Sequence, residues 1–220
     1  MRQKLAQEID LLDRRDLERG VDPGMGKPVI LAGITGNVFV AVVEFRDIAG
    51  KAPEPTAAIM DSQSVKTTGH GEERGYDAGK QVKGRKRHII VDTLGCLLLV
   101  LVTSASIQDR DGGLDLCVEL QQKFANIKKI WADQSYAGEL VDFIRQYFSF
   151  DLDIVKGSVN QHGFQVQPKR WIVERAFGWL NPFRRLSKDY ENTVESSEGM
   201  VKIAHVRLML RRVIPALYAL

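Results

Sequence analysis

Residues 57–66, with the sequence AAIMDSQSVK, begin the regular part of this chain. Small and apolar residues lead into a carboxylate, Asp61, and polar residues follow it up to Lys66. The pattern predicts a strand whose apolar part ends at Asp61. One such acid is ordinary, because an aspartate at a strand end commonly caps a turn or a following helix. Asp61 becomes informative only if later elements bring further acids to the same place.

The segments after this strand predict a regular series of elements. Residues 67–86 are rich in glycine and charge and predict a loop, whereas residues 87–106 predict two strands joined by the turn-forming residues DTLG. Asp109 or Asp111 is a suitable N-cap for a helix that follows. The remaining predicted elements are, in order, a strand ending at Asp133, a helix over 140–148, a strand over 150–158, a helix over 167–181 and a last helix over 198–214.

This order of elements predicts an α/β fold. Three strands that can pair antiparallel come first, and strand–helix units suited to parallel pairing follow. The order matches the ribonuclease H-like fold, a mixed five-stranded sheet flanked by helices on both faces. In that fold the first and fourth strands are neighbours.

The N-terminal part is less regular. Residues 1–20 predict a charged helix, and the apolar residues 29–45 fit either a strand or a buried helix. Residues 49–56, AGKAPEPT, contain two prolines and predict a linker. We therefore expect an atypical N-terminal segment over 1–50 and a main domain with a C-terminal helix over 51–220.

Composition and charge favour a soluble protein of the cytoplasm. Of the 220 residues, 44% are hydrophobic and 27% are charged, which is typical of a globular chain rather than a disordered one. Cys96 and Cys117 lie in apolar runs and are expected to be buried thiols in a reducing compartment. The first residues do not resemble a signal peptide, and the apolar runs over 28–43 and 94–102 are too short to span a bilayer.

Three acids fall at related places in the predicted fold. Asp61 and Asp133 end two strands that are expected to be neighbours, and Glu174 lies beside a helical apolar stripe, four residues after Arg170. Three carboxylates suit Mg²⁺ or Mn²⁺, and two such ions can activate a water or a 3′-hydroxyl in phosphodiester chemistry. The alternative is that each acid merely caps a turn or lies on a solvated helix face.

With these residues in place, the sequence resembles the DDE transposases of bacterial insertion sequences, in the group of the fourth and fifth insertion-sequence families. The resemblance covers about residues 46–213 and is carried by AAIMDSQSVKTT, GYDAGKQVKGRKRHIIVDTLG, IQDRDG, WADQSYAG and RWIVERAFGWLNPFRRLSKDYE. It implies a ribonuclease H-like catalytic domain that cuts and rejoins DNA with divalent metal, namely two ions of Mg²⁺ or Mn²⁺. It also implies that Asp61, Asp133 and Glu174 are the catalytic and metal-binding residues.

 The same resemblance implies DNA as the partner, namely the terminal repeats of the element and its target DNA, held by a homodimer near the bacterial nucleoid.

The sequence departs from the family pattern at a few positions. Gln167 stands where the wider group often has a tyrosine, and Asn181 stands where it often has a lysine. Residues 1–45 do not resemble the helical region that usually precedes the catalytic domain. We therefore expect a truncated or rearranged copy.

Basic residues form two groups. Residues 80–88, KQVKGRKRH, hold five lysines and arginines, which suggests phosphate contact along DNA, although a solvated loop would look the same. A second group surrounds Glu174, where Trp171 and Trp179 are expected to pack rather than to stack on a base. The residues expected to bind DNA are Lys80, Lys83, Arg85, Lys86, Arg87, Arg170, Arg175, Arg184, Arg185 and Lys188.

Three functions remain open at this point. The first is a DNA transposase that performs cleavage and strand transfer at insertion-sequence ends. The second is a ribonuclease H-like nuclease that cuts without strand transfer. The third is a catalytically silent DNA-binding remnant of a transposase.

Overall fold

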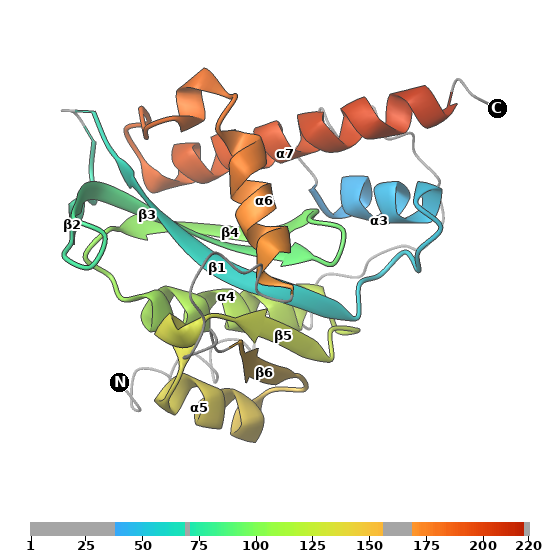
Figure 1. The fold of residues 1–220 in the computed structure, drawn as a ribbon, viewed down its shortest axis with the longest axis horizontal. Coiled ribbons are helices and arrows are strands. Elements are labelled where there is room, and N and C mark those ends of the chain that lie inside the picture. Colours follow the sequence, from blue (N-terminus) through green and yellow to red (C-terminus); the bar gives the residue numbers. More distant parts are fainter. Residues whose placement is uncertain (1–37, 69–70, 156–168, 218–220) are drawn as a thin grey trace, which may run out of the picture.

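The computed structural model describes residues 38–68, 71–155 and 169–217, which form one mixed β-sheet with helices on both faces (Figure 1). The strands are β1 (Ala57–Lys66), β2 (Gly75–Asp77), β3 (Val82–Asp92), β4 (Leu97–Ser104), β5 (Lys129–Ala132) and β6 (Asp151–Ile154). The helices are α3 (Val38–Ile48), α4 (Asp109–Lys123), α5 (Glu139–Tyr147), α6 (Arg170–Leu180) and α7 (Val194–Leu217). Two short 3₁₀ turns are η1 (Gln134–Tyr136) and η2 (Arg184–Leu186).

The order of the strands confirms the predicted fold. The main sheet runs β4, β3, β1, β5, β6, and β2 pairs with the first residues of β3. The first three long strands pair antiparallel, whereas β5 pairs parallel with β1 and with β6. This is the arrangement of a ribonuclease H-like sheet, with the first and fourth long strands side by side.

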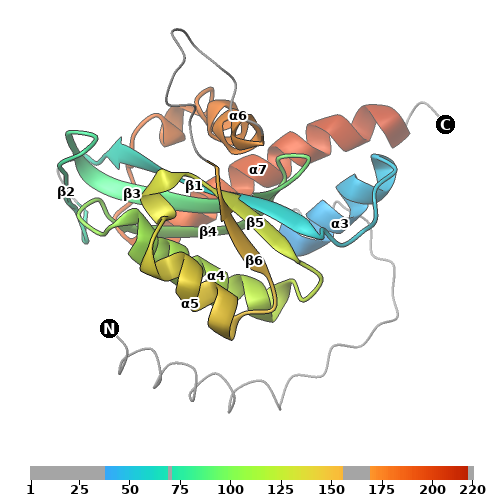
Figure 2. The same cartoon turned by 60° about the horizontal axis from the view of Figure 1, so that its bottom comes forward.

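Helices cover both faces of the sheet. Helices α3, α6 and α7 lie on one face and α4 and α5 lie on the other, as the turned view shows (Figure 2). Because helices cover both faces, β3 and β4 are buried along most of their length. β4 carries a continuous apolar run, whereas the buried part of β3 also includes charged residues. The core therefore extends through the whole sheet and orients the ends of β1, β5 and α6 relative to one another.

The predicted loop over residues 67–86 is only partly correct. It contains β2 and the first residues of β3, and Tyr76 pairs with Lys83 across them. The sequence did not predict these strands because their residues are largely polar or charged, whereas strand pairing is made by backbone hydrogen bonds and needs no apolar side chain. The predicted N-caps are also corrected: Gln108 occupies the N-cap of α4, and the carboxylate of Asp109 contacts Lys86 at 2.7 Å instead.

The apolar segment before the predicted linker is helical in its described part. Val38, Ala41 and Val42 of α3 belong to the same core cluster as the sheet, and Arg46 pairs with the buried Asp92 at 2.5 Å. The packing therefore does not break at residue 50. Residues 1–37 and Gln167 lie outside the described residues.

Two further expectations concern burial and membranes. Cys96 and Cys117 are both buried and neither forms a disulfide. Within the described ranges, none of the helices is long and apolar enough to cross a membrane.

Candidate active site

Asp61 lies where β1 leaves its neighbour β5. The parallel pairing of these strands ends at Ile59, and β1 then continues as far as Lys66 beside β3. Asp61 therefore lies within its strand and not at the end of it, although it does end the shared edge with β5. Its side chain is only 13% exposed, and its Oδ1 atom accepts a hydrogen bond of 2.7 Å from the backbone N–H of Ser62.

Asp133 follows β5 directly and serves as the N-cap of η1. Its Oδ1 atom accepts a hydrogen bond of 2.9 Å from the backbone N–H of Ser135. The capping role and a role in a site are therefore compatible, because the cap uses one carboxylate oxygen and leaves Oδ2 for another partner.

Glu174 lies on α6, which crosses β1 (Figure 1). The predicted apolar stripe of this helix is buried and consists of Ile172, Val173, Ala176, Phe177 and Leu180. Glu174 lies beside this stripe with 51% of its side chain exposed, so it reaches the edge of the sheet without entering the core.

Arg170 brings the three carboxylates together. Its Nη2 atom lies 3.4 Å from Oε1 of Glu174, one turn further along α6. The same atom lies 3.7 Å from Oδ2 of Asp61 and 3.8 Å from Oδ2 of Asp133. A single guanidinium nitrogen thus faces carboxylates from β1, from the turn after β5 and from α6.

Asp61 has a strongly shifted pKa in this site. Burial raises the pKa of Asp61 to about 6, the hydrogen bond from Ser62 lowers it, and the neighbouring charge of Asp133 raises it. Arg170 and Lys80 act in the lowering direction with smaller effect. A cation that approaches such a carboxylate stabilises its ionised form.

The donor set suits a divalent metal ion in its chemistry. Carboxylate oxygens are the ligands that Mg²⁺ and Mn²⁺ prefer, at about 2.0–2.1 Å for Mg²⁺. In the part of the chain that the structure describes, however, no group of three His, Cys, Asp or Glu side chains is arranged to hold a metal ion. The three carboxylates are instead arranged around the Arg170 guanidinium.

Residues 52–209 match the family model described as transposase DDE domain, and these residues make up more than half of the chain. The chain belongs to this transposase DDE domain family. A protein described as "Putative transposase for insertion sequence element IS402" from Burkholderia cepacia is 26% identical over 127 residues. The match covers 54% of this DDE domain chain and spans 60% of the length of that relative.

Solved structures give a weaker likeness. The pre-cleavage Mos1 transpososome has a TM-score of 0.37 and 8% identity, with 98% of this chain and 70% of that chain covered. The Mos1 mariner paired end complex with Mn has a TM-score of 0.37 and 11% identity, with 98% and 73% covered. Such TM-scores are too low to support a conclusion, so the fold of the DDE domain rests on its strand order.

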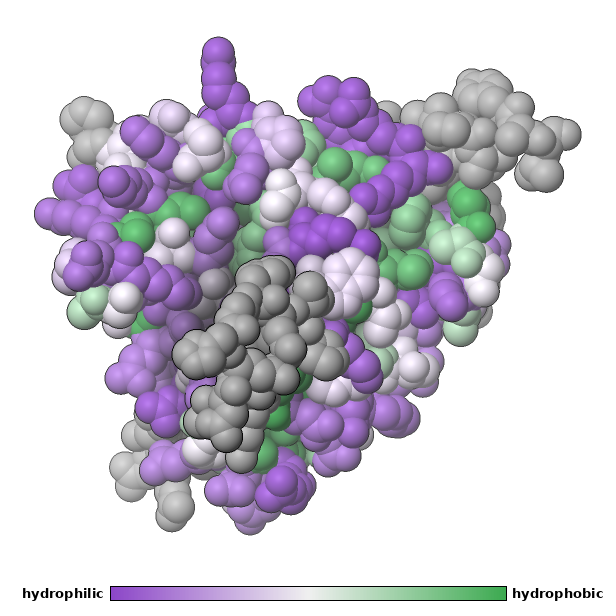
Figure 3. Space-filling view, in the orientation of Figure 1, coloured by the Kyte–Doolittle hydropathy of each residue, from purple (hydrophilic) through white to green (hydrophobic). Residues whose placement is uncertain are grey.

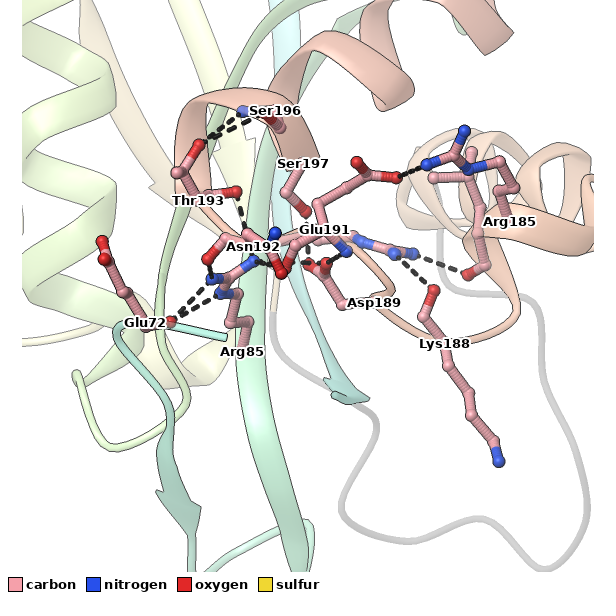
Figure 4. A network of polar contacts seen from close by, with 12 residues as sticks. Glu72, Arg85, Arg185, Lys188, Asp189, Glu191, Asn192, Thr193, Ser196 and Ser197 are labelled. Carbon is pink, nitrogen blue, oxygen red and sulfur yellow. Dashed lines mark hydrogen bonds and ion pairs between the residues drawn. The ribbon is translucent and has the colours of Figure 1, made fainter. Parts of the chain in front are cut away.

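The basic stretch over residues 80–88 corrects part of the DNA-binding prediction. Arg85, Lys86 and Arg87 are all buried in the DDE domain, with at most 5% of each residue exposed. Arg85 donates hydrogen bonds to backbone oxygens of Glu72 and of residues 191–193 (Figure 4). These three residues therefore hold the fold together and are not available to phosphates.

Lys86 and Arg87 are satisfied inside the protein as well. Lys86 lies 2.7 Å from Asp109 and 3.4 Å from Asp77, and it donates to the backbone oxygen of Ile107. Arg87 donates to the backbone oxygen of Leu186 at 2.9 Å. Buried charges of this kind persist because each is paired or hydrogen-bonded.

The other predicted basic residues lie at or near the surface. Lys83, Arg184 and Lys188 are exposed, and Arg185 is 61% exposed although it pairs with Glu191. Arg175 is half-buried and lies over the rings of Trp171 and Trp179. Trp179 packs against the core as expected, whereas Trp171 is exposed.

Lys80 belongs to the site more closely than the sequence indicated. Its Nζ atom donates to the backbone oxygen and the hydroxyl of Ser62, directly beside Asp61. A turn makes this possible, since Oδ1 of Asp77 accepts a hydrogen bond from the backbone N–H of Lys80. The DAGK sequence of that turn was the only local signal for it.

Proposed function

We propose that this DDE domain is the catalytic part of a DNA transposase, which cleaves and joins phosphodiester bonds at the ends of an insertion sequence. The observation that supports this is the convergence of three carboxylates from β1, the turn after β5 and α6. Family membership supports the same reaction class, because the matching family is that of transposase DDE domains.

In this proposal Asp61, Asp133 and Glu174 would hold two ions of Mg²⁺ or Mn²⁺. When bound, these ions would supply activation of a water or a 3′-hydroxyl as the nucleophile and stabilisation of the leaving oxygen of the phosphodiester. The protein contributes the positions of the oxygens, and no side-chain nucleophile is required.

The two aspartates share the same hydrogen-bonding arrangement. In each, Oδ1 accepts a backbone hydrogen bond, from Ser62 in one case and from Ser135 in the other, and Oδ2 faces Arg170. The fixed oxygen orients the carboxylate and leaves the second oxygen for a ligand. Glu174 is more exposed and lies on a helix, so it adjusts its position more easily than the aspartates do.

The proposed partners are the terminal repeats of the element and its target DNA. Lys83, Arg184 and Lys188 are the exposed basic residues that support phosphate contact. Lys188 lies next to the end of β1, because Thr67 and Asp189 form a bridge. Hydrophilic side chains predominate over that end of the sheet (Figure 3).

The first experiment is Mn²⁺-dependent nicking of supercoiled DNA by the purified chain. We expect the parent to nick and Asp133→Asn to lose nicking by at least about 100-fold, because the asparagine keeps the cap on η1 but removes a ligand charge. The matched control is Asp153→Asn on the neighbouring strand β6, where the carboxylate pairs with Lys129 at the surface. Equal nicking by the parent and by Asp133→Asn would refute the assignment of the trio.

A second assay separates transfer from simple hydrolysis. Supplied with a DNA end that carries a free 3′-hydroxyl, a transposase joins this end to a plasmid, whereas a nuclease produces only nicks. A folded parent that binds DNA but neither nicks nor joins it would contradict the proposed function.

A further inference from the structure

The guanidinium of Arg170 lies where a cation shared by the three carboxylates would be expected. Its Nη2 atom is 3.4–3.8 Å from one oxygen of each carboxylate. Its side chain is only 20% exposed, and it begins the helix that also carries Glu174. The contacts come from three separate elements, so they do not result from helical spacing alone.

We propose that Arg170 is a built-in counterion of the carboxylate trio, which competes with the divalent metal ion and is displaced when the ion binds. The inference rests on the proposed function, because it requires the trio to be a metal site. It assigns Arg170 a positioning role: the residue holds the carboxylates together in the metal-free protein and weakens metal binding until the site is in use.

The charges explain why a counterion is needed. Asp61, Asp133 and Glu174 each place a carboxylate oxygen within 3.8 Å of the same nitrogen atom, so three negative charges lie close together. Without a cation, three ionised carboxylates would spread apart. The arginine keeps their oxygens facing one point.

The distances explain why the arginine and a metal ion compete. Nitrogen–oxygen separations of 3.4–3.8 Å are much longer than the roughly 2 Å of a metal–oxygen bond. The oxygens would therefore have to close in to hold an ion, and that ion would then lie beside the positive charge of the Arg170 guanidinium. Withdrawal of the long arginine side chain removes this repulsion.

The test is the affinity of the DNA-free protein for Mn²⁺, measured by isothermal titration calorimetry and by the electron paramagnetic resonance signal of free Mn²⁺. We expect Arg170→Gln to bind Mn²⁺ about tenfold more tightly than the parent, because a like charge is removed from the site. The matched control is Arg175→Gln on the same helix, whose guanidinium lies over Trp171 and donates to the backbone oxygen of Leu94. This control should bind Mn²⁺ as the parent does.

A second measurement separates the two proposals. Asp61→Asn in the Arg170→Gln background should abolish the tighter binding, which shows that the ion occupies the trio. If the parent and Arg170→Gln bind Mn²⁺ equally and Asp61→Asn weakens both, the metal site stands and the counterion role is refuted. If neither protein binds Mn²⁺, the metal site and the proposed function fail together.

Discussion

Asp61 combines burial with a neighbouring negative charge, and both destabilise its ionised form when no cation is bound. Its side chain is 13% exposed, and its pKa is raised to about 6 from 3.8. The folded protein therefore holds this proton more tightly than the unfolded chain does. As pH rises from about 4 through 6, the unfolded chain releases the proton first, and stability decreases. Burial of this carboxylate therefore lowers stability at neutral pH.

Asp61→Asn should stabilise the protein in the presence of EDTA at pH 7.5. The penalty removed corresponds to the pKa shift, which is about 3 kcal/mol as an upper value. The gain should shrink as pH falls and vanish below about pH 3.8, where the carboxyl group is protonated in both the folded and the unfolded parent. Urea denaturation of both proteins at pH 7.5 and pH 4.5 measures this difference.

The control for this change is Asp153→Asn, which removes a surface ion pair with Lys129 and should alter stability by less than about 1 kcal/mol. An Asp61→Asn protein no more stable than the parent at pH 7.5 would show that burial does not destabilise this carboxylate.

At the scale of elements, helix α4 depends on two glycines for its contact with the sheet. A Cβ atom on Gly113 would lie 2.6 Å from the buried ring of Tyr136, and one on Gly112 would lie 2.5 Å from the ring of His88. Tyr136 ends η1, which Asp133 caps, so the approach of α4 also supports the candidate site.

Gly113→Ala should therefore destabilise the protein by about 1–3 kcal/mol, because overpacking outweighs the better helix propensity of alanine. The matched control is Gly178→Ala in α6, where an added Cβ would meet no atom within 4 Å beyond its chain neighbours and the backbone of its own helix. That change should stabilise by about 0.5–1 kcal/mol. Thermal unfolding of both variants compares the two effects, and equal shifts would mean that the space beside Gly113 opens freely.

The elements also show what the sequence could predict. The bounds of β1 and the apolar stripe of α6 were predictable because apolar spacing reports burial locally. The role of Arg85 was not, because its partner Asp189 lies 104 residues away, and a charged strand looks like a solvated one until that partner is known. The proximity of the three acids could be predicted from the order of the strands. The central place of Arg170 among them could not, because its contacts with Asp61 and Asp133 join residues far apart in the sequence.

At the scale of the whole molecule, the segment that precedes α7 is fastened to the sheet by buried arginines. Arg85 lies 3.3 Å from Oδ1 of Asp189, and both side chains are fully buried. Asp189 in turn accepts hydrogen bonds from the backbone N–H of Glu191 and from the hydroxyl of Ser197 (Figure 4). This network joins β3 to the exposed segment that carries Arg184 and Lys188.

Arg85→Met should destabilise the protein by about 3–5 kcal/mol, since it leaves the buried Asp189 without its ion-pair partner. Lys83→Met, on the same strand but exposed, should leave stability nearly unchanged. Salt titration of DNA binding should give the opposite pattern: the slope should decrease by about one for Lys83→Met and stay constant for Arg85→Met. Arg85→Lys keeps the charge and provides a milder variant if the methionine protein does not fold. A reduced slope for either Arg85 variant at full folding would mean that this buried arginine reaches DNA, and that β3 opens when the complex forms.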